Sequence, residues 1–157
     1  MSKSPEVYGV HRFKVEIEGL HVAGFSEVEG LSIDVETEEY REGGLNSFIH
    51  HFPVITKFEP IVLKRGISDA NSTDLLWDWY KDYTMGKITK KDGSIILNDQ
   101  KGMEICRWNF FQAQPISWRG PAFNSFSSEV AIESFQLVHE GLKLEFETNY
   151  DTAWLYE

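Results

Sequence analysis

Hydrophobic and polar residues alternate along several short stretches of the chain. Apolar residues occupy every second position over 13–17, and the same alternation returns over 33–37, where the intervening residues are acidic. A period of two places one face of a strand on a core and the other face in water. Alternation also predicts strands over residues 130–137 and 142–146, and further strands are predicted over 56–63 and, on either side of a turn-rich stretch, over 94–97 and 103–112.

One segment has the periodicity of a helix instead. Ser72 or Thr73 is suited to cap a helix that continues to about Tyr83. At about 100° per residue, one face of this helix is apolar and the opposite face is acidic. The apolar face is predicted to contain Leu75, Leu76, Trp79, Tyr80 and Tyr83, and the acidic face Asp74, Asp78 and Asp82.

Turn residues divide these elements. The stretch 98–102 joins two strands as a β-hairpin, and Pro60 predicts a sheet edge or a bulge because it has no backbone N–H to donate. Gly43 and Gly44 break the alternation after Tyr40 and predict a loop whose backbone a side chain would obstruct. The elements together predict a single mainly β domain over residues 1–157, an antiparallel barrel or sandwich with one flanking α-helix.

Charge and cysteine usage restrict the partners and the compartment. The 157 residues carry 15 Lys and Arg against 25 Asp and Glu, a formal net charge of −10. Such a surface repels nucleic-acid phosphates and anionic lipids. Cys106 is the single cysteine, so no internal disulfide forms and a reducing compartment is indicated. The N-terminal residues lack the apolar run of a signal peptide and no stretch is apolar enough for a membrane anchor, so we expect synthesis in the cytoplasm.

The sequence gives little support for a catalytic or metal-binding site. His50 and His51 are adjacent on a predicted strand and therefore point to opposite faces, which disfavours a shared metal. The carboxylates around Glu36 are typical of a solvated strand face, and Cys106 lies mid-strand, as a packing residue does. We therefore predict no enzyme activity, no cofactor and no metal site. Trp108 and Trp118 leave open a monomeric carbohydrate-binding or adhesin-like domain.

A series of motifs resembles the tube proteins of contractile phage tails and related extracellular injection systems. The opening stretches FKVEIEGL (13–20) and AGFSEVEGL (23–31) carry the likeness first, and PISWRGP (115–121) continues it. The other matching stretches, in the family's order, are residues 39–44, 63–67, 108–110, 130–133 and 139–142. Only the region around 46–56 matches no motif of the family.

The resemblance implies a structural role and a fold similar to the tube protein of type VI secretion. It implies hexameric rings that stack into a hollow tube, a contracting sheath around that tube, baseplate or hub partners, and room for cargo in the lumen. The subunit and ring interface is expected at Tyr40, Arg41, Glu42, Gly43, Gly44, Arg65 and Trp118. The acidic helix face, with Asp74, Asp78 and Asp82, is expected to face the sheath.

Overall fold

The computed structural model describes residues 6–18, 20, 24–44, 48–68 and 75–147. These residues form nine strands and one helix. In chain order they are β1 (Phe13–Ile17), β2 (Phe25–Glu29), β3 (Ile33–Tyr40), β4 (His50–Phe58), β5 (Ile61–Gly66), α1 (Leu75–Thr84), β6 (Lys91–Asn98), β7 (Glu104–Arg119), β8 (Ile132–Val138) and β9 (Gly141–Phe146).

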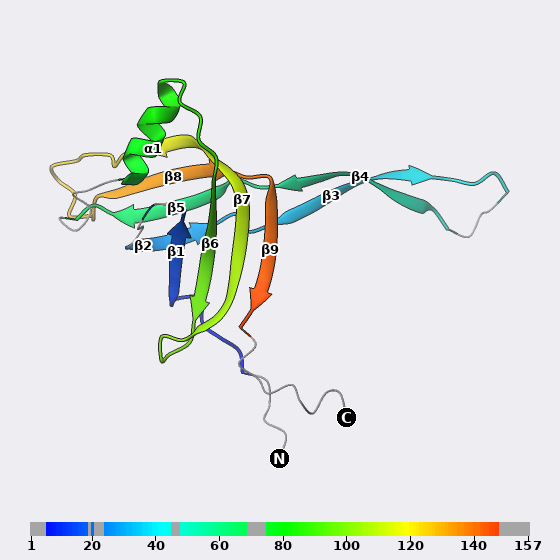
Figure 1. Ribbon diagram of the computed structural model, residues 1–157, viewed down its shortest axis with the longest axis horizontal. Coiled ribbons are helices and arrows are strands. Elements are labelled where there is room, and N and C mark those ends of the chain that lie inside the picture. Colours follow the sequence, from blue (N-terminus) through cyan, green and yellow to red (C-terminus); the bar gives the residue numbers. More distant parts are fainter. Residues whose placement is uncertain (1–5, 19, 21–23, 45–47, 69–74, 148–157) are drawn as a thin grey trace, which may run out of the picture.

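The strands are antiparallel and form two sheets of different size. Seven strands make one sheet in the order β1-β6-β7-β8-β5-β2, with β9 paired to β7 beside β8. Strands β3 and β4 form a separate two-stranded hairpin that leaves the body toward one end of the longest axis (Figure 1). The helix α1 covers the body near the other end. The prediction of a mainly β, antiparallel fold with one flanking helix is confirmed.

The long strand β7 turns a corner at Gln112. Over Cys106–Phe111 it pairs with β9 and β6, and beyond Gln114 it pairs with β8. Gln112 lies between these two parts with a φ of 53°, a left-handed conformation that residues other than glycine seldom adopt. Its N–H donates to Asp92 Oδ1 at 2.9 Å, which holds the corner. In Figure 1, β7 accordingly bends from the group β1, β6 and β9 toward β8.

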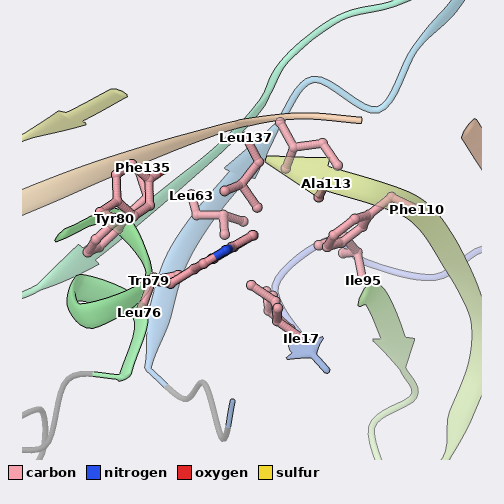
Figure 2. Close-up of a cluster of buried hydrophobic side chains, with 12 residues drawn as sticks. Ile17, Leu63, Leu76, Trp79, Tyr80, Ile95, Phe110, Ala113, Phe135 and Leu137 are labelled. Atoms are coloured by element: carbon pink, nitrogen blue, oxygen red, sulfur yellow. The ribbon is translucent and has the colours of Figure 1, made fainter. Parts of the chain in front are cut away.

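The core lies inside this curved sheet and under α1 (Figure 2). The alternation predicted for β1 is confirmed, because Val15 and Ile17 are buried while Lys14 and Glu16 are exposed. Burying each large apolar side chain contributes about 1.5–3 kcal/mol. The buried cluster consists of Val15, Ile17, Ile61, Leu63, Leu76, Trp79, Tyr80, Ile95, Phe110, Ala113, Phe135 and Leu137.

The helix confirms part of the sequence prediction. Leu76, Trp79 and Tyr80 are buried, and Trp79 Nε1 donates to the Thr89 carbonyl at 2.8 Å. Leu75 is predicted on the same face but is 39% exposed, at the first residue of the helix. The expected caps at 72 and 73 lie outside the described residues.

The single strand predicted over 56–63 is wrong. The chain forms two strands there, and it leaves the ladder at Glu59 and Pro60 before β5 begins. Gly30 lies against this break with a φ of 97°, and a Cβ on Gly30 would lie 2.0 Å from the Pro60 carbonyl oxygen. The segment between β2 and β3 therefore lies close to the segment between β4 and β5, and the missing side chain of Gly30 permits this approach. This is the point where the β3–β4 hairpin joins the body.

A second close approach gives a test of the packing. A Cβ on Gly93 would lie 2.3 Å from Phe110 Cζ and 2.6 Å from the Glu16 carbonyl oxygen. We expect Gly93→Ala to lower the free energy of unfolding by about 1–3 kcal/mol through overpacking, measured by urea denaturation. Gly43→Ala is the control, because nothing lies within 4 Å of a Cβ there. Equal stability of the two variants would contradict the packing described here.

Candidate functional site: the assembly surfaces

The β3–β4 hairpin, here called the arm, is exposed on both of its faces. Every residue of β3 is exposed, and so is every residue of β4 except those at its two ends. This corrects the prediction that the alternation of β3 places one face on a core, because the arm has left the body that contains the core. Its apolar side chains are each about half exposed, namely Ile33, Val35, Phe52, Val54 and Ile55.

Aromatic side chains gather toward the outer end of the arm. Tyr40 contacts Phe52 with ring centroids 6.0 Å apart, and Phe48 contacts His50 at 4.8 Å. Tyr40, Phe48 and Phe52 nevertheless remain 52%, 54% and 53% exposed. We call these four residues the arm-tip cluster. An exposed apolar group of this kind is typical of a surface that contacts another molecule.

The loop after Tyr40 confirms only part of its prediction. Arg41, Glu42, Gly43 and Gly44 are all exposed beside the arm-tip cluster. Gly44 has a φ of 96° and thus needs the freedom of glycine. Gly43 has no positive φ, and a Cβ at either glycine would meet nothing within 4 Å. A side chain at Gly44 would therefore strain the backbone. At neither glycine would a side chain clash with neighbouring atoms.

A second surface is the outward face of β1, β6, β7 and β9. The pairings align Glu16 with Ser94, Ser94 with Asn109, and Asn109 with Lys143 on this face. The same register aligns Arg107 with Glu145. We call this the polar face. It carries basic and acidic side chains side by side: Lys14, Arg107 and Lys143 accompany Glu16, Glu104 and Glu145, and Glu18 and Asp92 line the same surface as Glu16, Ser94 and Asn109.

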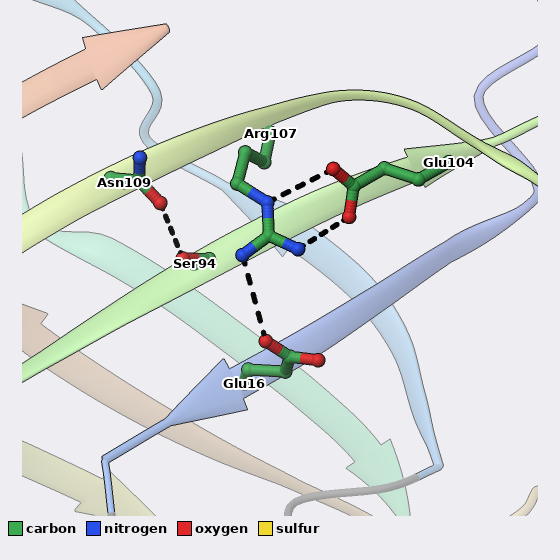
Figure 3. A network of polar contacts seen from close by, with 5 residues as sticks. All are labelled: Glu16, Ser94, Glu104, Arg107 and Asn109. Atoms are coloured by element: carbon green, nitrogen blue, oxygen red, sulfur yellow. Dashed lines mark hydrogen bonds and ion pairs between the residues drawn. The ribbon is translucent and has the colours of Figure 1, made fainter. Parts of the chain in front are cut away.

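Arg107 organises the polar face (Figure 3). Its Nε donates to Glu104 Oε2 at 3.0 Å, and its Nη1 lies 3.8 Å from Glu16 Oε2. The hydrogen bond from Arg107 lowers the pKa of the Glu104 carboxyl below its usual range. Ser94 Oγ is 2.6 Å from Asn109 Oδ1 in the same view. Sequence reasoning did not identify this surface, although the charged residues of β1 were its visible signal.

Arg65 does not lie at the surface, contrary to the expectation for an interface residue. It is 4% exposed, and its Nε donates to Glu133 Oε1 at 2.6 Å. Its guanidinium lies over the Phe25 and Phe135 rings at 5.7 and 5.0 Å. The reason is the alternation of β5, which directs Ile61, Leu63 and Arg65 to the same inner face.

Trp118 connects this buried pair to the surface. Its Nε1 donates to Glu133 Oε2 at 3.2 Å, and its ring packs edge-on against Trp77 of α1 with centroids 4.7 Å apart. Trp118 is 39% exposed and Trp77 is 42% exposed. Trp118 is thus placed where a neighbouring molecule can reach it.

The acidic helix face is smaller than predicted. Asp78 is exposed, whereas Asp82 is half-buried and lies 3.8 Å from the Lys87 ammonium group. Asp74 lies outside the described residues. Among the residues that the structure describes, no three His, Cys, Asp or Glu side chains are grouped to hold a metal ion. No described helix is long and apolar enough to cross a membrane.

These surfaces agree with a match to a known family. Residues 10–143 match the family model of the T4-like virus tail tube protein gp19. The chain belongs to this family. The predicted resemblance to contractile tube proteins is thereby confirmed, and the structural role replaces the carbohydrate-binding alternative. No curated protein sequence matches significantly.

Solved structures of contractile systems resemble the chain over most of its length. A chain of the PVC sheath–tube complex, an extracellular contractile injection system in its extended state, is 27% identical, with a TM-score of 0.80 over 90% of this chain and 93% of that one. A chain of the PVC sheath/tube terminator is also 27% identical, with a TM-score of 0.81 over 91% and 99%. A type six secretion system protein is 12% identical over 85% and 83%, with a TM-score of 0.54, and shares the fold.

The chain is therefore a tail tube protein of contractile phage-tail-like injection systems. Its family is structural, so the prediction that it is not an enzyme is confirmed. Chains similar to it occur in complexes that contain sheath and tube, and one of similar fold occurs in the anti-feeding prophage cap.

His139 gives a pH test of the region where the arm joins the body. Its ring lies 5.1 Å from that of Phe58, the last residue of β4, and 6.3 Å from that of Phe110. Its Nδ1 is 2.9 Å from the Gly141 carbonyl oxygen. Burial lowers the pKa of the imidazole from its usual value of 6.5. The folded protein therefore resists protonation at this position.

We expect the stability due to neutral His139 to be present above about pH 6.5 and to be lost progressively below it. The unfolded chain binds the proton first, since its imidazole has the higher pKa. The free energy of unfolding of the native chain, minus that of His139→Gln, should decrease between pH 7.5 and 5 in chemical denaturation. His11→Gln is the matched control for loss of an imidazole. A difference that is constant with pH would contradict the prediction.

Proposed function

We propose that this tail tube protein assembles into hexameric rings, and that the rings stack into a hollow tube which a contracting sheath drives through a target envelope. The observation that carries the proposal is the arm, whose apolar side chains are exposed on both faces. An isolated two-stranded hairpin is marginally stable in water, so contact with another subunit would stabilise it. The loop Arg41–Gly44 and Tyr40 are then part of the contact, as the resemblance implies.

The edges of the large sheet support a ring. The polar face is bordered by β1 on one side and β9 on the other, and within the described residues each pairs with one neighbouring strand only. A strand with an unpaired edge can continue a sheet into another chain. Because β1 and β9 are different strands, their contact is head-to-tail, and repetition of such a contact closes a ring.

The polar face is then the lining of the tube. Its basic side chains Arg107 and Lys143 are paired with carboxylates: Arg107 with Glu104 and Glu16, and Lys143 with Glu145. Opposite charges held close together are wetted by water, and each weakens the field that the other exerts on a passing molecule. Such a lining suits a conduit that releases its cargo. Trp118 remains a candidate interface residue because it is partly exposed, whereas buried Arg65 is no longer one.

The sheath, baseplate and hub are the further partners. Support comes from the complexes in which similar chains occur, which contain a sheath in one case and belong to a baseplate in another. The exposed side of α1 suits the sheath, because Asp78 lies there and Asp82 is next to it. Exposed ion pairs contribute about 0–1 kcal/mol each, which permits release during contraction.

Substitution of the arm tests the assembly. We expect Tyr40→Ser with Phe52→Ser to leave a folded protein by circular dichroism, because both side chains project from the arm into solvent. The same variant should form no tubes in electron micrographs, since the apolar contact is lost. Moderate salt should favour native assembly by screening the charge of −10 on each subunit.

The control carries the same kind of change elsewhere. Met85→Ser with Ile88→Ser replaces two apolar residues that are 77% and 63% exposed after α1. This control should assemble like the native chain. Normal tubes from the arm variant, or a native chain that stays monomeric at high concentration and at every salt, would contradict the proposed function.

Charge reversal tests the sheath surface. We expect Asp78→Lys with Asp82→Lys to form normal tubes but to prevent the sheath from polymerising around them, as seen by electron microscopy of reconstituted particles. Asp78→Asn with Asp82→Asn should reduce sheath assembly less, because it removes attraction without adding repulsion. Normal sheathed particles from the Lys variant would eliminate this role for α1.

A further inference from the structure

The segment between β7 and β8 presents two aromatic rings to solvent. Residues 120–131 contain no strand or helix. Within them, Phe123 is 89% exposed, Phe126 is 98% exposed and Val130 is 73% exposed. Large apolar side chains exposed to this degree lose hydrophobic stabilisation unless another molecule covers them. We call residues 120–131 the aromatic loop.

The aromatic loop is held in shape by its own hydrogen bonds. Asn124 accepts twice, from the Ser127 N–H at its carbonyl oxygen (3.1 Å) and from the Phe126 N–H at Oδ1 (3.0 Å). The Glu129 N–H donates to Ser127 Oγ at 3.2 Å. A loop ordered in this way keeps its rings displayed, and little conformational entropy is lost when a partner binds.

Charge limits what can cover the loop. Residues 120–128 contain no charged side chain, although the chain as a whole carries −10. Two copies of an acidic protein can approach through an uncharged patch without bringing carboxylates together. The arm-tip cluster needs such a patch, because its strand β3 also carries the exposed carboxylates of Glu36, Glu38 and Glu39.

The position of the loop matches the position of the arm. In Figure 1 the aromatic loop, which joins β7 to β8, lies at one end of the longest axis and the arm extends to the other end. Complementary surfaces at opposite ends of a molecule produce a head-to-tail contact that repeats along a line. Such repetition is the geometry that stacked rings require.

We propose that the aromatic loop is the site that receives the arm-tip cluster of a subunit in the adjacent ring. Phe123 and Phe126 contact Tyr40, Phe48 and Phe52 of that second copy, so aromatic rings cover one another on both sides of the contact. Trp118 and Trp77, partly exposed beside the start of the loop, extend the same apolar surface. This inference rests on the proposed stacking of rings and adds the surface by which the arm is bound.

Cross-linking between two differently substituted subunits tests the contact. One subunit carries Ser125→Cys in the aromatic loop and the other carries Arg41→Cys beside the arm-tip cluster, so all the aromatic residues are kept. Both positions are exposed, whereas the native Cys106 is buried. Mixed tubes treated with a short bismaleimide should give a heterodimer that contains both substitutions. Lys101→Cys paired with Arg41→Cys is the matched control and should give none, because Lys101 is exposed in the turn between β6 and β7, away from the aromatic loop.

The outcomes separate this inference from the proposed function. Tubes that yield no Ser125→Cys heterodimer, or that yield as much with Lys101→Cys, would overturn the inference while the tube role stands. A native chain that forms neither rings nor tubes would overturn both. The expected result is a heterodimer from intact tubes and none from tubes dispersed into separate rings before the bismaleimide is added.

A second variant tests the direction of the contact. Phe123→Ser with Phe126→Ser changes two solvent-exposed residues, so the fold should be retained in circular dichroism. We expect electron micrographs to show single rings and no stacks. Loss of the rings themselves would place the loop at the contact within a ring and would overturn the inference.

Discussion

The corner in β7 determines how the molecule presents its surfaces. One strand of 16 residues belongs to two parts of the sheet, and Gln112 marks the change between them. A left-handed conformation at a residue with a side chain costs roughly 1–2 kcal/mol, and the hydrogen bond to Asp92 offsets part of this cost. β8 and β9 follow one another along the same edge of β7, so the corner bends this edge together with β7.

The apolar side chains of the arm stabilise the single chain less than those of the body do. The body buries its apolar side chains within one chain, whereas the arm exposes them at about half of their surface. The glycine at position 30 allows the two segments to cross closely at Pro60, so the arm leaves the body through a narrow and well-packed junction. The core of the body is therefore complete within one chain, whereas the apolar side chains of the arm add little to it.

The sequence predicted the elements that contribute to the core better than those that contribute to assembly. Alternation identified β1 and β8, in which the inner residues are buried, and the turn residues 98–102 identified the hairpin of β6 and β7. The same alternation in β3 was misleading. A period of two shows that a strand has an apolar face and a polar face, but it does not show that the apolar face is covered by the same chain. The polar face of the large sheet was missed because charged residues on a strand normally indicate only exposure to water. The local sequence does not show where such a face would lie in an assembly of subunits.

Arg65 shows the corresponding limit for charged residues. A basic residue near the end of a predicted strand is ordinarily expected at the surface, yet Arg65 is buried against Glu133 and two aromatic rings. Its partner is 68 positions away in the chain, so only the pairing of β5 with β8 brings the two together. Residues of the arm tip and the aromatic loop pose the opposite problem. They are apolar by sequence and exposed in the subunit, so hydrophobicity along the chain gives the wrong prediction of burial for them.

The distribution of charge connects these observations. A chain of net charge −10 cannot associate with its own copies through acidic surfaces without electrostatic cost. The structure places ion pairs on the polar face, residues 120–128 are uncharged, and exposed carboxylates lie on the arm strand β3 and at Asp78 of α1. Association through apolar patches changes little with salt concentration, whereas the ionic contacts proposed for α1 are weakened as the salt concentration rises. At a salt concentration that releases the sheath, a tube built in this way would keep its subunits together.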